Sequence, residues 1–411
     1  MTSNKPTTRQ LRRINRSSLL RQIYFGGPIS RLELSQLTEL SPATATNLTG
    51  ELLAEGVIVE SGVEESEGGR PRTLLKINPE FGYFIGIDVG ETRIQSELFD
   101  LTMHRLCTVI HPLNREENQP RQVVEPIVAG VQDLLAQAKL QPNDVLGVGI
   151  GMPGVVDPAS GVSVYAPNWD WHDVPFLTIL KARLNMPIYL DNGAKAMALA
   201  ESLFGAGRDK DSLAVLLVGT GIGAGIITEG SLYRGATNSA GEWGHVTVEL
   251  GGRLCRCGSQ GCLEAYAGAP GIIQRMLELA PENRLLQNSD QMTTIIAIAE
   301  AARNGDQKAM QVLKDTAVYL GAGVANLINL VNPQLILLGG WVWMQIGDVI
   351  YGEFCQAIEQ YALKQPFSKT QIGQCQLGQD AVPMGAATLP LNFFLEAAGN
   401  KLLAGYHELT P

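Results

Sequence analysis

One histidine and three cysteines lie close together in the segment HVTVELGGRLCRCGSQGCLE, residues 245–264. They are His245, Cys255, Cys257 and Cys262, in the pattern H-x9-C-x-C-x4-C. Imidazole nitrogen and thiolate sulfur are the ligands that tetrahedral zinc prefers, and a closed set of four leaves no position for a catalytic water. We therefore expect one structural zinc ion per chain. The alternative is that these thiols are merely buried or form a disulfide.

The composition describes a chain large enough for two or three domains, each with its own core. Its 411 residues are 45% hydrophobic and 18% charged, with a formal net charge of −10. No apolar run approaches the roughly 20 residues of a membrane span, and the N-terminus has no apolar secretion signal. We expect a cytoplasmic protein without membrane insertion. In a reducing cytosol, closely spaced cysteines indicate metal binding before disulfides.

The charge is distributed unevenly along the chain. Residues 1–30 contain six basic residues and no acidic one, so the negative charge belongs to the rest of the chain. A basic end on an acidic body indicates a module that binds DNA, which would place the protein on the nucleoid.

Helix signals predict three short helices at this basic end. The first ends at Gly26-Gly27-Pro28, the second begins with the capping box Ser30-Arg31-Leu32-Glu33, and the third begins at Ser41-Pro42. Two extended runs separated by a polar loop follow and predict a hairpin. This order is typical of a winged helix-turn-helix domain, which we expect to occupy residues 1–82.

From residue 83 the chain is rich in glycine and alternates strands with helices. FIGIDVGETRIQSELFD reads as a strand, a glycine turn and a strand, and SLAVLLVGTGIGAGIITEGSLY repeats that theme later in the chain. Two such segments predict an α/β body with a duplicated core.

The cysteine-rich segment closely resembles the zinc loop of the ROK family of repressors, uncharacterised open reading frames and sugar kinases. That loop reads G-H followed by C-x-C-G-x2-G-C-x-E, and this chain has GEWGHVTVELGGRLCRCGSQGCLE. Further segments similar to family motifs are GTGIGAGIITEG at 219–230, NLINLVNPQLILLGG at 326–340 and VPMGAA at 382–387. With its basic N-terminal module, the chain resembles the NagC/XylR-type transcriptional regulators of this family.

The resemblance implies a two-lobed, actin-like or hexokinase-like (ribonuclease H-like) α/β body. Lobe 1 would comprise residues 83–192 plus 382–411, and lobe 2 residues 193–381. It also implies a sugar in the cleft between the lobes, contacted by Asn192, Glu242, His245 and Glu264. Carboxylates and an amide can pair with vicinal hydroxyls, and a zinc-bound histidine has its second nitrogen fixed in direction. Asn168 lies where the family often places another sugar-contacting asparagine; the alternative for Asn168 is a turn residue.

One substitution argues against catalysis. Family kinases read roughly E-N-D-A-N-A-A-A-L-A-E, with the aspartate as general base, whereas this chain reads DNGAKAMALAE with Gly193 at the base position. Losing a positioned base lowers the rate about 10²- to 10⁴-fold. Glu91 also replaces a glycine of the first phosphate turn, D-x-G-G-T, and brings negative charge towards the place of the ATP phosphates. We expect no enzyme activity; rescue by Asp191 is the alternative.

For DNA we expect contacts from the third helix, the hairpin loop and the first helix. Small and short polar side chains suit base edges in the major groove, arginine in a G-G-R loop suits a narrow A/T-rich minor groove, and further arginines neutralise phosphates. The residues are, in that order, Ala43, Thr44, Thr46 and Asn47, then Gly69, Arg70 and Arg72, then Arg12 and Arg16. The alternative is that the basic run is a solvated helix face and the module mediates dimer contacts.

The expected function is a sugar-responsive transcriptional regulator, most simply a repressor of carbohydrate uptake or catabolism genes. It would bind an A/T-rich palindromic operator as a homodimer or tetramer, with a sugar or sugar phosphate as effector. One alternative is an active ATP-dependent sugar kinase with a DNA-binding domain. The other is a repressor controlled by a protein partner, such as a sugar-transporter component.

Overall fold

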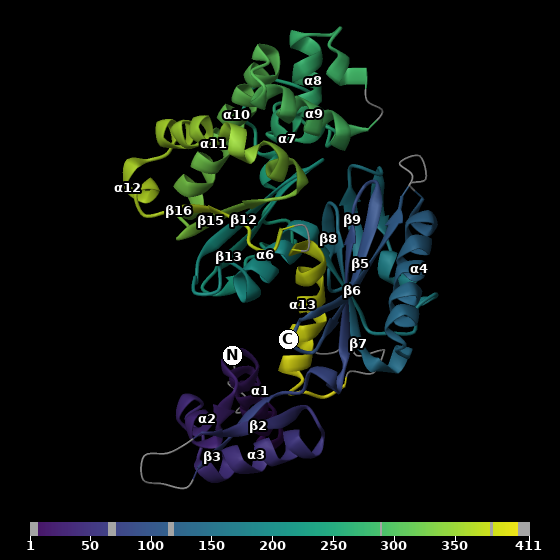
Figure 1. Ribbon diagram of the computed structural model, residues 1–411, viewed down its shortest axis with the longest axis vertical. Coiled ribbons are helices and arrows are strands. Elements are labelled where there is room, and N and C mark those ends of the chain that lie inside the picture. Colours follow the sequence, from purple (N-terminus) through teal and green to yellow (C-terminus); the bar gives the residue numbers. More distant parts are fainter. Residues whose placement is uncertain (1–6, 65–70, 114–118, 288–289, 379–380, 402–411) are drawn as a thin grey trace.

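The structure is a computed structural model, and it describes residues 7–64, 71–113, 119–287, 290–378 and 381–401. The expected loop residues Gly69 and Arg70 lie outside these ranges. An N-terminal domain, lobe 1 and lobe 2 follow one another along the long axis of the molecule (Figure 1). None of the helices in the described ranges combines the length and the apolar character that a membrane crossing requires.

The N-terminal domain has the expected order of three helices and a hairpin. Its helices and strands are α1 (Thr8–Gly26), β1 (Ile29–Ser30), α2 (Arg31–Leu37), α3 (Pro42–Ala54), β2 (Ile58–Glu64) and β3 (Arg72–Ile77), with sheet order β1-β3-β2. Ser30 and Glu33 form the capping box of α2, and the Ser41 side chain accepts the Thr44 N–H to cap α3. The sequence signals for these helix starts are therefore confirmed.

Lobe 1 is built on a sheet that, in the described residues, has the order β11-β7-β4-β5-β6. Its elements are η1 (Pro79–Phe81), β4 (Tyr83–Val89), β5 (Arg93–Asp100), β6 (Arg105–Pro112), α4 (Pro120–Ala138), η2 (Pro142–Asp144), β7 (Val145–Met152), α5 (Phe176–Lys181) and β11 (Ile188–Asn192). A small sheet of β8 (Val155–Asp157), β9 (Val162–Ala166) and β10 (Trp171–Val174) adjoins it. Every residue of β7 is buried, as expected for a central strand covered on both faces.

Lobe 2 repeats the plan with the sheet order β14-β13-β12-β15-β16. Its elements are α6 (Gly193–Phe204), β12 (Leu213–Val218), β13 (Ile222–Thr228), β14 (Ser231–Leu232), η3 (Trp243–His245), α7 (Glu264–Ala267), α8 (Ala269–Leu279), η4 (Arg284–Gln287), α9 (Gln291–Arg303), α10 (Gln307–Val331), β15 (Leu335–Gly339), α11 (Trp341–Tyr361), α12 (Lys364–Phe367) and β16 (Gln371–Gln374). In both lobes an antiparallel hairpin, β4–β5 or β12–β13, has a parallel neighbour, β7 or β15. The duplicated core is thus present.

Helix α13 (Ala381–Glu396) returns to lobe 1, covers β4 and β7, and packs against α6. The contact is close enough to require glycine at three positions. A Cβ on Gly86 would lie 1.9 Å from the Pro383 carbonyl oxygen, one on Gly149 1.8 Å from that of Ala386, and one on Gly385 1.8 Å from that of Ala196. Backbone therefore lies against backbone on both sides of α13.

The N-terminal domain shares a hydrophobic core with lobe 1. Leu19, Leu20 and Ile23 of α1 belong to the same buried cluster as Phe84 of β4 and Phe394 of α13. Figure 1 shows α1 beside the end of α13. At that end, the Ser17 hydroxyl donates to the Leu395 carbonyl (2.8 Å). The domain is therefore docked on the body.

Candidate metal and sugar site

The predicted metal ligands lie together in the structure. One ligand atom from each of His245, Cys255, Cys257 and Cys262 can be chosen so that all four lie within 4.8 Å of one another. The Cys255 Sγ to His245 Nδ1 distance and the Cys257 Sγ to Cys262 Sγ distance are both 3.7 Å. Two sulfurs bound to one tetrahedral zinc at about 2.3 Å stand roughly 3.8 Å apart. The cluster can therefore hold a metal ion, and its cysteines are free thiols.

The turns of the metal-ligand loop, residues 245–264, depend on two of its glycines. Gly258 has φ +90° and Gly261 has φ +77°, which side chains rarely adopt. A Cβ on Gly261 would also lie 1.8 Å from the Glu249 carbonyl oxygen. The G-x2-G spacing thus brings Cys262 back towards Cys255 and Cys257.

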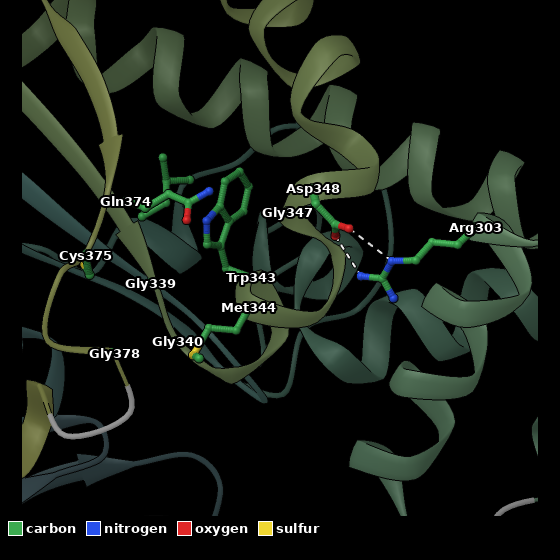
Figure 2. A pocket seen from close by; sticks show the side chains of 11 residues that line it. Arg303, Gly339, Gly340, Trp343, Met344, Gly347, Asp348, Gln374, Cys375 and Gly378 are labelled. Carbon is green, nitrogen blue, oxygen red and sulfur yellow. Dashed lines mark hydrogen bonds and ion pairs between the residues drawn. The ribbon is translucent and has the colours of Figure 1, made fainter.

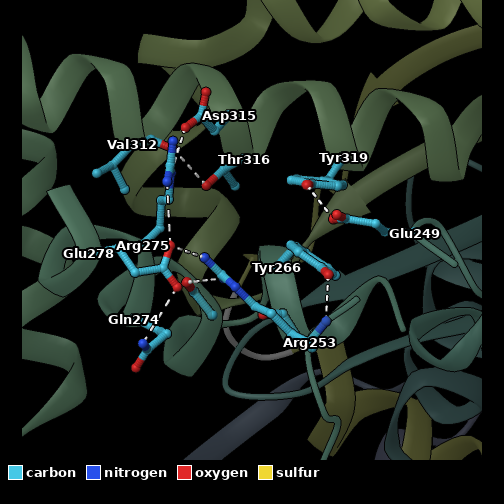
Figure 3. Close-up of polar contacts among 12 residues, drawn as sticks. Glu249, Arg253, Tyr266, Gln274, Arg275, Glu278, Val312, Asp315, Thr316 and Tyr319 are labelled. Carbon is cyan, nitrogen blue, oxygen red and sulfur yellow. Dashed lines mark hydrogen bonds and ion pairs between the residues drawn. The ribbon is translucent and has the colours of Figure 1, made fainter. Parts of the chain in front are cut away.

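A polar network attaches this loop to α8 and α10 (Figure 3). The Arg253 amide N–H donates to the Tyr266 hydroxyl (2.7 Å), and its guanidinium pairs with Glu278 (2.7 Å). The Tyr319 hydroxyl of α10 donates to Glu249 (2.8 Å), and the Tyr319 ring stacks on Tyr266. The metal-ligand loop is therefore held on helices of lobe 2.

Three predicted sugar contacts meet beside the metal cluster. The Glu264 carboxylate, at the start of α7, accepts the Ile222 N–H through Oε2 (2.8 Å) and the Arg256 Nε–H through Oε1 (2.8 Å). The His245 ring turns Nδ1 towards Cys255, which leaves Nε2 for another partner. Burial raises the pKa of the Glu242 carboxyl, against the charges of nearby His245 and Lys195. Acceptors and an imidazole that can bind hydroxyls thus converge.

The two predicted asparagines differ in what they can offer a ligand. Asn168 lies between β9 and β10, and its Nδ2 is buried with no hydrogen-bond partner. The Asn192 side chain caps α6: Oδ1 accepts the Ala194 and Lys195 N–H groups (2.9 and 3.2 Å), and Nδ2 donates to the Gly154 carbonyl (2.8 Å). Asn168 therefore has a donor to spare, whereas Asn192 has at most one amide hydrogen left.

Sequence reasoning named Asp191 but missed Lys195, a buried cation beside this site. The fully buried Asp191 carboxylate pairs with Arg234 (2.7 Å) and accepts the Asn192 N–H (2.8 Å). The Lys195 ammonium donates to the Asn238 carbonyl, and burial lowers the pKa of Lys195. A lysine within the otherwise small and apolar helix GAKAMALA was the available signal. A carboxylate paired in this way gives no support to Asp191 as a replacement base.

Gly193, which the resemblance places at the position of the kinase base, has room for a side chain. Gly193 is the first residue of α6, and a Cβ there would lie 3.6 Å from Val382 Cγ1 and 3.8 Å from the Met152 carbonyl oxygen. Both are ordinary contact distances. Packing therefore does not demand glycine at this position.

The predicted DNA contacts mostly lie on the surface. Ala43, Thr46 and Asn47 of α3 are exposed, Thr44 is half-buried, Arg72 is exposed at the start of β3, and Arg12 is exposed and paired with Glu51. Arg16 differs. Its buried guanidinium donates to the Ala398 carbonyl (2.8 Å) and pairs with Glu55 (2.8 Å), so it joins α1 to the segment after α13. The prediction that Arg16 contacts phosphate is wrong in this structure.

A cavity of about 270 Å³ lies elsewhere in lobe 2, where β15 and β16 meet α11 (Figure 2). The Trp343 indole forms one wall, and its buried Nε1 has no hydrogen-bond partner. The Arg303–Asp348 ion pair (2.7 Å) lies at another side. None of the residues that line this cavity belongs to the predicted metal or sugar sets.

The ROK family profile matches residues 84–392. The xylose repressor of Caldicellulosiruptor bescii is 33% identical over 390 residues, which cover 94% of this chain and 97% of that protein. The crystal structure of a ROK family transcriptional regulator, a homologue of the E. coli MLC protein, has a TM-score of 0.80 and 28% identity, and covers 95% of this chain and 98% of that one.

A ROK family glucokinase from Streptomyces griseus, in complex with glucose and AMPPNP, has a TM-score of 0.66 and 32% identity. It covers 75% of this chain and 99% of its own. The family profile spans most of the chain, and the relatives share both its sequence and its fold. This chain therefore belongs to the ROK family.

Proposed function

We propose that this protein is a sugar-responsive transcriptional repressor of carbohydrate uptake or catabolism genes. The observation that carries the proposal is how much of the chain is similar to the xylose repressor and to the ROK family transcriptional regulator. The repressor and the regulator match the chain almost from end to end, N-terminal domain included, whereas the glucokinase covers 75% of it. The N-terminal domain is thus part of what this chain has in common with gene regulators.

The N-terminal domain acts as a winged helix-turn-helix that binds operator DNA. Helix α3 offers Ala43, Thr44, Thr46 and Asn47 to the major groove. Arg12 and Arg72 reach phosphates or the minor groove, together with Gly69 and Arg70 of the loop. A homodimer or tetramer would present two such domains to an A/T-rich palindrome of chromosomal DNA in the cytoplasm.

The effector is a sugar bound beside a structural zinc ion. His245, Cys255, Cys257 and Cys262 hold the zinc, which supplies no reaction chemistry because its four positions are filled by protein. Glu242, His245 and Glu264 accept or donate to hydroxyls, Asn168 contributes its unpartnered N–H groups, and Asn192 contributes its remaining one. Gly193 cannot take a proton from a hydroxyl, so the sugar is bound and not phosphorylated.

Sugar binding reaches the DNA through α13. Residues 83–192 with 382–411 form one lobe of the cleft and residues 193–381 the other, with α6 beginning at the sugar site. Helix α13 packs on α6, and the segment that follows it holds Arg16. A ligand that binds more tightly to one arrangement of the lobes, closed or open, therefore changes the orientation of residues 1–82 relative to the body.

The test begins with selection of bound duplexes from a random library, followed by fluorescence anisotropy with the selected DNA and a panel of pentoses and hexoses. The name of the bacterial relative makes xylose the first sugar to add. At least one sugar should weaken DNA binding, and ADP release with the same sugars and MgATP should stay at background.

Brisk sugar-dependent ADP release would reject the repressor-only proposal in favour of a kinase. Sequence-specific DNA binding that no sugar alters, with no sugar raising thermal stability, would favour control by a protein partner such as a transporter component. Failure to bind any duplex would reject the DNA-binding role of the N-terminal domain.

A further inference from the structure

Three charged side chains form a chain of ion pairs across the two lobes. Arg256 Nη1 lies 2.7 Å from Glu91 Oε1, and Arg256 Nε lies 2.8 Å from Glu264 Oε1. Glu91 belongs to the turn between β4 and β5 of lobe 1, whereas Arg256 and Glu264 belong to the metal-ligand loop and α7 of lobe 2. The Glu91–Arg256 pair therefore joins the lobes, and we call it the clasp.

The clasp lies between the two glycine turns of the duplicated core. Glu91 follows Gly90 in the first turn. At the second turn, a Cβ on Gly221 would lie 2.6 Å from Arg256 Nη2 and 2.9 Å from Glu264 Oε2. The Arg256 guanidinium thus lies against the second turn, at Gly221, while the Glu91 carboxylate that pairs with it comes from the first turn. The space between the turns is occupied by this chain's own side chains.

The charge in the space between the two turns disfavours the binding of an added anion. Two carboxylates share one guanidinium, so the local sum is negative, and the side chains are largely withdrawn from solvent, with 20% of Glu91, 30% of Arg256 and 7% of Glu264 exposed. A polyphosphate between the turns would have to displace Glu91 from Arg256 and would still face Glu264. Partial burial makes that repulsion stronger than in water.

We propose that the Glu91 carboxylate is an internal anion that occupies the phosphate position of this cleft by binding Arg256. The carboxylate joins the lobes through Arg256 without a nucleotide and keeps polyphosphate groups out. Arg256 is the only cation of the clasp, so freeing it creates an anion site and removing it does not. The clasp thereby closes the space between the two turns to polyphosphate groups.

The test measures the binding of inorganic tripolyphosphate to the full-length protein by isothermal titration calorimetry. In Glu91→Gln the guanidinium is unpaired on one side and the local charge is neutral, so binding should tighten at least about tenfold over wild type. Arg256→Gln leaves two carboxylates without their cation and should bind no more tightly than wild type. The double variant should lose the gain of Glu91→Gln.

Small-angle X-ray scattering supplies a second readout. Both single variants break the clasp, so both should have a larger radius of gyration than wild type, and tripolyphosphate should reverse the expansion of Glu91→Gln alone. The matched control is Glu125→Gln, which removes a lobe 1 carboxylate that pairs with Arg183 away from the cleft. It should match wild type in both measurements.

The gain in tripolyphosphate affinity in Glu91→Gln, without a gain in Arg256→Gln, distinguishes the clasp from a general loss of structure, which would change the affinity of both variants in one direction. The proposal is overturned if both variants change affinity in the same direction, if Glu91→Gln binds tripolyphosphate no better than wild type, or if neither variant expands. Should Arg256→Gln fail to fold, Glu91→Gln against Glu125→Gln still decides the matter. Neither DNA nor sugar is used, so failure here is separable from failure of the proposed repressor function.

Discussion

Exchange of a glycine for alanine should have opposite effects on stability in α11 of lobe 2 and in the C-terminal helix α13. Gly385 lies inside α13, where a Cβ would stand 1.8 Å from the Ala196 carbonyl oxygen of α6. Gly352 lies inside α11 and is exposed, and a Cβ there would meet nothing within 4 Å. The two substitutions are chemically identical and differ only in the space around the new methyl group.

The magnitudes follow from that difference. In an exposed helix interior, alanine is favoured over glycine by about 1 kcal/mol, so Gly352→Ala should raise the melting temperature of a chain of this length by about 1 °C. At Gly385 the two helices would have to separate by more than about 1 Å, and such overpacking costs about 1–3 kcal/mol or more beyond the propensity gain. Gly385→Ala should therefore lower the melting temperature by about 1 to 4 °C.

Thermal unfolding followed by circular dichroism measures both shifts. The same helix pair carries the proposed signal, so Gly385→Ala should also reduce the ratio of DNA affinities without and with sugar, whereas Gly352→Ala should leave that ratio unchanged. A melting temperature that rises equally in both variants would refute the backbone-to-backbone contact of α6 and α13. A destabilised Gly385→Ala with a normal sugar response would refute the route through this crossing.

Three further changes test the metal site, a buried acid and the DNA contact. Cys257→Ser removes one of four ligands, so bound zinc measured by plasma mass spectrometry should fall from about one per chain to near zero, and unchanged zinc would contradict the ligand set. Burial raises the pKa of Asp88 from 3.8 to about 6. The folded protein then keeps a proton that the unfolded chain loses. The free energy of unfolding should fall by up to about 3 kcal/mol as pH rises from 4 to 7. Urea unfolding of Asp88→Asn should lack this part of the pH dependence, and a variant with the same pH dependence as wild type would contradict the role of Asp88. Asn47→Ala should weaken binding to the selected operator about tenfold or more with little effect on an unrelated duplex in anisotropy, and equal losses on both would make Asn47 a phosphate contact.

Features with short-range causes could be predicted from the sequence. The capping residues Ser30 and Ser41 act on N–H groups three positions away, and the three cysteines of the metal-ligand loop lie within eight positions of one another. In each case the residue type fixes the chemistry and the spacing fixes the geometry. Those parts of the fold and of the site needed no knowledge of tertiary packing.

Arg16 shows a signal that was present and not used. It stands three, four and seven positions before Leu19, Leu20 and Ile23, so it shares their helix face. An arginine on that stripe is expected to be buried and paired, as its contacts with Glu55 and the Ala398 carbonyl show. Net charge alone placed it among the exposed arginines.

The clasp could not be predicted by any local pattern. Glu91 and Arg256 are 165 positions apart. From the local sequence alone, Glu91 is explained as a turn residue and Arg256 as the residue between two predicted metal ligands, Cys255 and Cys257. The partner of a charged side chain depends on how the lobes are placed, which spacing along the chain does not encode. The same holds for the pairing of Asp191 with Arg234.

The contacts of α13 restrict how lobe movement can be absorbed. Gly86 and Gly149 let it lie directly on the lobe 1 sheet, Gly385 lets it lie directly on α6, and Ser17 bonds its last turn to the N-terminal domain. Closely packed backbone slides poorly, because any shift brings carbonyl oxygens into contact. Rotation of lobe 2 therefore moves α6 and strains α13, whose last turn is bonded to α1 through Ser17. We expect the N-terminal domain to change its orientation with such a rotation, because Ser17 and Arg16 of α1 are bonded to the last turn of α13 and to the segment after it.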